Sequence, residues 1–120
     1  MKIDYEGRNF RSVRAEGSGE VDGATIFRYH QSGNTVWAEY EGGSIVRGQL
    51  IAIADENGSL EMRYHHLNES GHIMAGKCRS TPELLEDGRL RLHETWEWTT
   101  GDRSSGSSIL EEIRDLPKRL

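Results

Sequence analysis

Short turn signals recur at regular intervals along the chain, and this spacing constrains the fold more than any other sequence feature. Each signal pairs glycine with serine, asparagine, aspartate or a second glycine, at Ser32-Gly33-Asn34, Gly42-Gly43, Asn57-Gly58, Ser70-Gly71, Asp87-Gly88 and Gly101-Asp102. Between the signals, polar and apolar residues alternate with the period of two that is typical of β-strands. The pattern predicts strands near residues 9–16, 24–31, 35–41, 44–54, 60–68, 72–80, 89–99 and 105–113.

Antiparallel strands joined in chain order leave an exposed edge at each side of the sheet. Closure into an up-and-down barrel removes both edges, because the first strand then pairs with the last. We therefore expect an all-β fold, a single antiparallel β-barrel of about eight strands that forms one domain over residues 1–120. The apolar spacing over residues 105–116 also permits a helix, although a strand is the preferred prediction.

The composition limits the interior and the partners of such a barrel. Hydrophobic residues make up 34% of the 120 residues, which is few for a solid core, so we expect a partly polar interior. The net charge of −5 has the wrong sign for binding a nucleic-acid backbone. No apolar run approaches the roughly 18 residues that span a membrane, residues 1–6 lack a signal-peptide core, and Cys78 is the only cysteine. These features predict a cytoplasmic protein without nucleic-acid or membrane partners, and they leave the oligomeric state open.

The turns also predict which residues face inward, because the register follows by counting if each turn is a two-residue loop. Around Gly33-Asn34, Phe27 lies opposite Tyr40 on the apolar, inward face, and Arg28 lies opposite Glu39 on the outward face. Continued through the later turns, the count divides the interior into two zones. The aliphatic zone contains Ile51, Ile53, Leu60, Met62, Leu90 and Leu92. The polar zone contains Arg47, Gln49, Tyr64, His66, Lys77, Arg79, Glu94, Trp96 and Trp98.

The polar zone suggests a binding site. Its cations, Arg47, Lys77 and Arg79, face a single carboxylate, Glu94, which leaves an excess of positive charge. Arginine forks bind carboxylates and phosphates, and tryptophan rings form the walls of small-molecule pockets. The zone therefore predicts binding, without catalysis, of a small anionic or carboxylate-bearing molecule. The predicted ligand-binding residues are Arg47, Gln49, Tyr64, His66, Lys77, Arg79, Glu94 and Trp96.

Two other interpretations of the same residues stay open. In the first, Arg79 and Glu94 neutralise each other in a plugged interior, and the barrel is a structural or interaction module with a partner surface around Trp37. In the second, the register slips by one residue at Ser70-Gly71. Lys77 and Arg79 would then point into water, and Met74, Gly76 and Cys78 would point inward.

Motifs for catalysis or metal binding are weak. His65 and His66 are adjacent on a predicted strand and so face opposite sides, which does not predict a metal site. Residues 14–19 match the R-x-x-G-x-G pattern that binds the pyrophosphate of acetyl-coenzyme A in N-acetyltransferases. That motif leads into a helix, whereas the next segment here is strand-like, so we interpret it as a glycine-rich turn. No catalytic residue and no cofactor are predicted from these patterns.

Three segments, residues 26–40, 62–66 and 92–98, resemble a family of small bacterial proteins usually labelled N-acetylglutamate synthases. The resemblance spans almost the whole chain. It implies a compact calycin-like β-barrel, similar in architecture to lipocalins and avidins. It also implies an alternative function, acetyl transfer from acetyl-coenzyme A to glutamate, with acetyl-coenzyme A as the cofactor in that case. No catalytic residue of that reaction is implied at a position in this chain.

Overall fold

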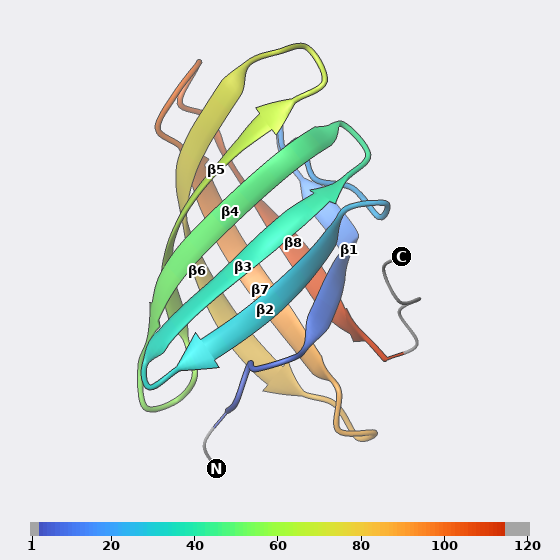
Figure 1. The fold of residues 1–120 in the computed structure, drawn as a ribbon, viewed down its shortest axis with the longest axis vertical. Coiled ribbons are helices and arrows are strands. Elements are labelled where there is room, and N and C mark those ends of the chain that lie inside the picture. Colours follow the sequence, from blue (N-terminus) through green and yellow to red (C-terminus); the bar gives the residue numbers. More distant parts are fainter. Residues whose placement is uncertain (1–2, 115–120) are drawn as a thin grey trace.

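The structure is a computed structural model that describes residues 3–114, and its strands form a closed barrel (Figure 1). The strands of this range are β1 (Asn9–Glu16), β2 (Ile26–Ser32), β3 (Thr35–Gly42), β4 (Ile45–Ala54), β5 (Leu60–Asn68), β6 (Ile73–Leu84), β7 (Leu90–Trp98) and β8 (Ser105–Ile113). Each strand pairs antiparallel with the next, and β8 pairs with β1. The predicted all-β, up-and-down barrel is therefore confirmed.

The predicted strand boundaries agree closely with the observed ones, except that β6 continues to Leu84 instead of ending near residue 80. Residues 105–113 form a strand and not a helix, while Leu116 lies outside the described residues. The glycine-rich stretch after β1 opens a connection, residues 17–25, that leads into the strand β2. Within residues 3–114, no helix has the length and apolarity needed to cross a membrane.

The two ends of the barrel differ in how they are filled. The N-terminal segment lies at the lower end in Figure 1, where the fully buried Tyr5 donates a hydrogen bond to the carbonyl of Gly58 at 2.6 Å. The side chains that fill this end are fully buried and apolar: Phe10, Leu60, Leu90 and Leu92. The lower half is consequently a packed core, and open space is left to the upper half.

Three of the hairpin turns have a loop one residue longer than predicted. The backbone N–H of Asp55, Asn68 and Leu85 bonds to the carbonyl of the residue four positions later, which leaves three residues in each loop. The last loop residue is Gly58, Gly71 or Gly88, with φ of 84°, 84° and 87°. This left-handed conformation is typical of three-residue hairpin loops.

The extra residue after β5 makes the predicted facing of β6 wrong. Leu67 pairs with Ile73, which turns Gly76, Cys78 and Ser80 inward. Lys77 and Arg79 therefore lie on the outer surface, as in the slipped register considered for the sequence. The equally long loop before β7 reverses the error, and the predicted inward residues of β7 are correct.

A β-bulge makes the predicted facing of β4 wrong as well. Gly42 pairs with Ile45 but Tyr40 pairs with Gly48, so β4 holds one extra residue between these pairs. Beyond the bulge, Arg47 and Gln49 point outward. Two isoleucines predicted inside also lie on the surface, with 60% exposure at Ile51 and 64% at Ile53. The longer loop after β4 restores the correct facing of β5.

Candidate functional site

A cavity of about 60 Å³ lies in the upper half of the barrel. Its aromatic lining consists of Phe27, Tyr40, Tyr64, Trp96 and Trp98. Its polar lining consists of Glu20, His66, Glu94 and Ser108, and its aliphatic and sulfur-containing lining includes Val21, Leu50, Met62, Cys78 and Leu110. A cavity needs at least about 10–15 Å³ of such free space to hold one water molecule, so this one suits a head group of a few heavy atoms.

Aromatic residues and glycines alternate around the cavity wall. Tyr40 pairs with Gly48, Tyr64 with Gly76, and Trp96 with Gly106 across neighbouring strands. A Cβ atom at each of these glycines would overlap the ring of its partner. The missing side chains therefore let three rings lie along the wall instead of filling the cavity, a small-and-large alternation that small barrels use to shape their interior.

Trp98 joins these rings into a continuous surface. Its ring centroid lies 5.8 Å from Trp96, 5.6 Å from Tyr64 and 5.6 Å from His66. Its indole N–H also donates to the carbonyl of Ser18 at 3.2 Å, in the β1–β2 connection. The aromatic wall is thus fastened directly to the segment that covers the upper end.

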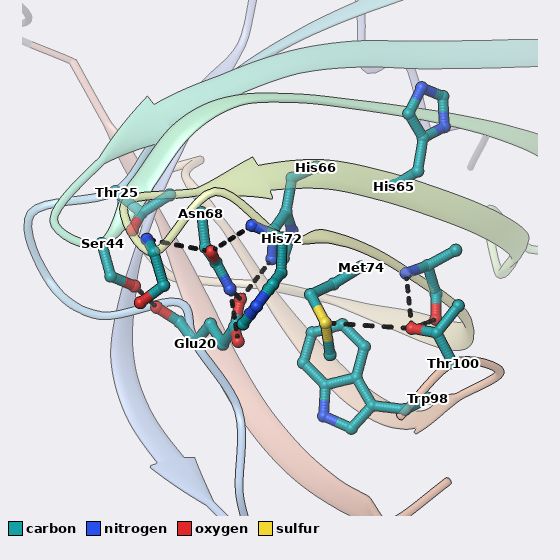
Figure 2. Close-up of polar contacts among 12 residues, drawn as sticks. Glu20, Thr25, Ser44, His65, His66, Asn68, His72, Met74, Trp98 and Thr100 are labelled. Atoms are coloured by element: carbon teal, nitrogen blue, oxygen red, sulfur yellow. Dashed lines mark hydrogen bonds and ion pairs between the residues drawn. The ribbon is translucent and has the colours of Figure 1, made fainter. Parts of the chain in front are cut away.

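Glu20 fixes that connection through polar contacts with β5 (Figure 2). Its Oε1 lies 2.8 Å from His66 Nε2, and Asn68 Nδ2 donates to its Oε1 and Oε2 at 3.3 and 3.2 Å. The Ser44 hydroxyl donates to the Glu20 carbonyl at 2.9 Å. Figure 2 shows the Glu20 side chain pointing toward Asn68 and His66, whereas His65 points away.

Both ring nitrogens of His66 have hydrogen-bond partners. A carboxylate only accepts hydrogen bonds, so Nε2 carries the proton and donates to Glu20. In the neutral ring, Nδ1 accepts from the Tyr40 hydroxyl at 2.9 Å. Burial lowers the pKa of His66 from its usual 6.5, although the hydrogen bond and the charge of Glu20 act in the opposite direction. Every polar atom of this imidazole has a partner.

Glu94 lies nearer the middle of the barrel and has fewer partners. It pairs in register with Ser80 on β6 and with Ser108 on β8. Within the described part of the chain, Glu94 Oε2, Ser80 Oγ and Tyr29 Oη are buried without a hydrogen-bond partner. Burial raises the pKa of Glu94 from 4.5 to about 7, while the nearby serine hydroxyls act in the opposite direction.

Four of the eight predicted ligand-binding residues line the cavity: Tyr64, His66, Glu94 and Trp96. The other four, Arg47, Gln49, Lys77 and Arg79, are exposed on the outer surface. There, Arg79 pairs with Glu61, and Lys77 Nζ lies 3.9 Å from Glu97 Oε2. The predicted pair of Arg79 and Glu94 is therefore wrong, because the two side chains lie on opposite faces of the barrel wall.

Sequence reasoning did not assign several lining residues to the site. The inward facing of Tyr40 and Trp98 was predicted, and the glycine opposite Tyr40 is the signal that could have marked its role. The inward facing of Cys78 was expected only in the slipped register. Glu20 lies in the irregular β1–β2 connection, where no periodic pattern exists.

The lining offers contacts for binding more clearly than groups for catalysis. Burial and the nearby negative charge of Glu94 raise the pKa of the Cys78 thiol, so its nucleophilic thiolate does not form at neutral pH. In residues 3–114, no group of three or more His, Cys, Asp or Glu side chains is placed to hold a metal ion.

Comparison with known proteins gives one family match. The family model described as avidin-like protein matches residues 3–113, which covers all eight strands. No curated protein matches the chain.

Proposed function

The chain belongs to the avidin-like protein family, and we propose that it binds a small molecule, without chemical change, in the upper half of its barrel. The observation that carries this proposal is the cavity between the aromatic wall and Glu94. A partly open, mainly apolar space with a few convergent polar groups is typical of small-molecule sites. Avidin-like proteins bind small ligands such as biotin, which supports the same general role.

The structure does not support the expectation that the ligand is an anion. It depended on Arg47, Lys77 and Arg79, which lie outside the barrel. The ionisable residues of the cavity lining include two carboxylates, Glu20 and Glu94. An anionic head group would be repelled by these side chains, so the proposal is for a ligand whose buried part carries no negative charge.

The alternative functions receive less support. Acetyl transfer is not favoured by any feature of the cavity, and residues 14–19 lead into a loop and a strand where a pyrophosphate site needs a helix N-terminus. A fully plugged interior does not agree with open space beside Glu94. If the protein released coenzyme A from acetyl-coenzyme A in the presence of glutamate, acetyl transfer would be favoured instead.

Titration of the protein with small probes tests the proposal. The probes are biotin and three matched four-carbon compounds, 1-butanol, butylammonium and butyrate, followed by calorimetry and by the indole N–H signals of Trp96 and Trp98. Binding should perturb these signals and raise the melting temperature by mass action. If no probe changes either quantity, the proposal is wrong.

A pair of variants on β6 locates the binding. Cys78→Leu places additional carbon atoms in the cavity and should weaken binding by about tenfold or more, since overfilled sites leave no room for a ligand. Lys77→Leu makes a similar change at the neighbouring outward position, where the side chain is 49% exposed, and should leave binding unchanged. Equal affinities of the two variants would place the ligand elsewhere.

A further inference from the structure

The charged side chains that line the cavity have one sign. Glu20 and Glu94 contribute carboxylates, and among the described residues that line the space there is no lysine or arginine. Burial lowers the pKa of the neighbouring His66 below 6.5, so its ring is neutral at neutral pH. The interior is therefore electrostatically suited to a positive charge.

The aromatic wall suits the same charge. Trp96, Trp98 and Tyr64 surround the space next to Glu94. The faces of such rings carry partial negative charge and attract organic cations, tryptophan most strongly. An aromatic wall beside a carboxylate thus combines two independent attractions for one kind of ligand.

Glu94 also has an unused place for a hydrogen-bond donor. The residue is only 9% exposed and lines the cavity. The Ser80 and Ser108 hydroxyls lie near its carboxylate, yet within the part of the chain that the structure describes its Oε2 has no hydrogen bond of good geometry. Buried acceptors in native proteins nearly always have a donor. A ligand N–H group that reaches Glu94 would complete this pairing, and the rest of the ligand would extend toward the mouth beside Glu20.

We propose that the ligand of this cavity is a small organic cation whose N–H-bearing head group binds Glu94 between the aromatic side chains of the upper barrel. The inference rests on the proposed function and deepens it by naming the chemical class of the ligand. A neutral molecule of the same shape would lose the charge contact with Glu94, and an anion would be repelled.

Binding should then depend on the ionisation of Glu94. Five titratable groups lie close enough to Glu94 for its charge to affect their pKa values. They are Tyr5, Tyr29 on β2, Tyr40 on β3, Tyr64 on β5 and Cys78 on β6. Burial raises the pKa of each of these groups, so all are neutral between about pH 5 and 9. Glu94 itself, with a pKa of about 7, changes charge in this range. The pKa of His66, which lines the same cavity, lies below 6.5, so this ring gains a positive charge only toward the acidic end.

The test compares butylammonium, 1-butanol and butyrate, which differ mainly in the charge of the head group. At about pH 8, butylammonium should bind at least tenfold more tightly than 1-butanol, and butyrate should bind most weakly. An alkylammonium keeps its proton at lower pH while Glu94 gains one, so affinity should fall roughly 30-fold between about pH 8 and 5.5. The wild-type pH profile needs no variant and keeps the proposal testable if a variant fails to fold.

Two variants of β7 complete the experiment. Glu94→Gln should remove both the preference for butylammonium over 1-butanol and the pH dependence. Glu97→Gln changes an outward carboxylate on the same strand, 51% exposed, and should retain both.

The possible results separate this proposal from the proposed function. Equal binding of 1-butanol and butylammonium, or a preference that survives in Glu94→Gln, would overturn the cationic ligand but leave small-molecule binding in place. Failure of all the probes, biotin included, would overturn both.

Discussion

Two glutamates line the same cavity but are held in different ways. Glu20, 25% exposed, lies at the mouth and accepts hydrogen bonds from His66 and Asn68. Glu94, 9% exposed, lies farther inside, beside two serine hydroxyls, with one carboxylate oxygen unpaired. The carboxylate of Glu20 at the mouth thus has hydrogen-bond partners for both oxygens, whereas that of Glu94 nearer the centre does not.

The difference separates a structural role from a binding role. Partners supplied by β5 let Glu20 fasten the β1–β2 connection over the barrel. Glu94 has only the hydroxyls of Ser80 and Ser108 beside it, and its burial disfavours the charged form. Among the described residues that line the cavity, no lysine or arginine offsets that charge. A group that destabilises the empty protein but faces a cavity is typical of a site organised for a ligand.

The largest expected effect is on the pH dependence of stability, through Glu94→Gln. The carboxyl has a pKa of about 7 in the folded protein and 4.5 in the unfolded chain. As pH rises from 4.5 to 7, the unfolded chain loses this proton first, so the wild type loses stability, by about 3 kcal/mol for a shift of this size. The variant lacks this loss. The difference in free energy of unfolding between variant and wild type should grow by about 3 kcal/mol from about pH 4 to 8, as measured by urea denaturation.

Glu97→Gln provides the control, because its carboxylate is exposed on the same strand. Its stability difference from wild type should stay nearly constant over the same pH range. A constant difference for Glu94→Gln as well would show that the buried carboxyl titrates normally, and the contrast between the two glutamates would disappear.

A smaller loss is expected when the hydrogen-bonded cluster at the mouth is broken. His66→Leu removes the donor to Glu20 and the acceptor of the Tyr40 hydroxyl, and should cost about 2 kcal/mol of stability at neutral pH. His65→Leu alters the neighbouring side chain, which points outward, and should change stability by less than about 0.5 kcal/mol. Urea denaturation of both variants measures the difference. Equal values would mean that the mouth cluster contributes no net stability.

The strand boundaries and the closed barrel were predictable because alternation and turn signals are local properties of the sequence. The facing of each strand depends on loop length, and Asn57-Gly58, Ser70-Gly71 and Asp87-Gly88 have the composition of two-residue turns although their loops contain three residues. One extra residue exchanges the two faces, and a second one exchanges them back. The bulge at the start of β4 exchanged the faces of that strand, and the three longer loops then restored them in β5, exchanged them in β6 and restored them in β7. The predicted inward residues of β5 and β7 were therefore correct, and those of β4 and β6 were mostly wrong.

The same errors in strand facing affected the prediction of the candidate site. The inward facing of His66 and Glu94 was predicted correctly because they lie on β5 and β7, whereas Arg47 and Lys77 were misplaced because they lie on β4 and β6. The predicted interior consequently had the wrong sign of charge. Glu20 comes from an irregular connection, so only the three-dimensional arrangement brings it to the mouth.

Glu20→Gln weakens the mouth cluster without emptying it. The amide oxygen still accepts one hydrogen bond, but the contacts with His66 and Asn68 lose the charge that strengthens them, which should cost about 1 kcal/mol of stability. Because the β1–β2 connection is then held less firmly, bound probes should exchange faster. Line-shape analysis of the Trp98 indole signal during titration measures this rate. Slower or unchanged exchange would show that Glu20 does not control access to the cavity.

The smallest effect expected is on the titration of His66. In the wild type, the hydrogen bond and charge of Glu20 partly oppose the lowering of its pKa by burial. Glu20→Gln removes the charge but not the burial, so the pKa of His66 should fall further below 6.5. Since the unfolded chain still binds that proton near its usual pKa, the variant should also lose more stability than wild type as pH falls below 6.5. NMR titration of the imidazole signal checks the first statement and urea denaturation the second. A higher pKa in the variant would mean that Glu20 does not stabilise the charged ring, and that the mouth carboxylate is as poorly coupled to its neighbours as Glu94.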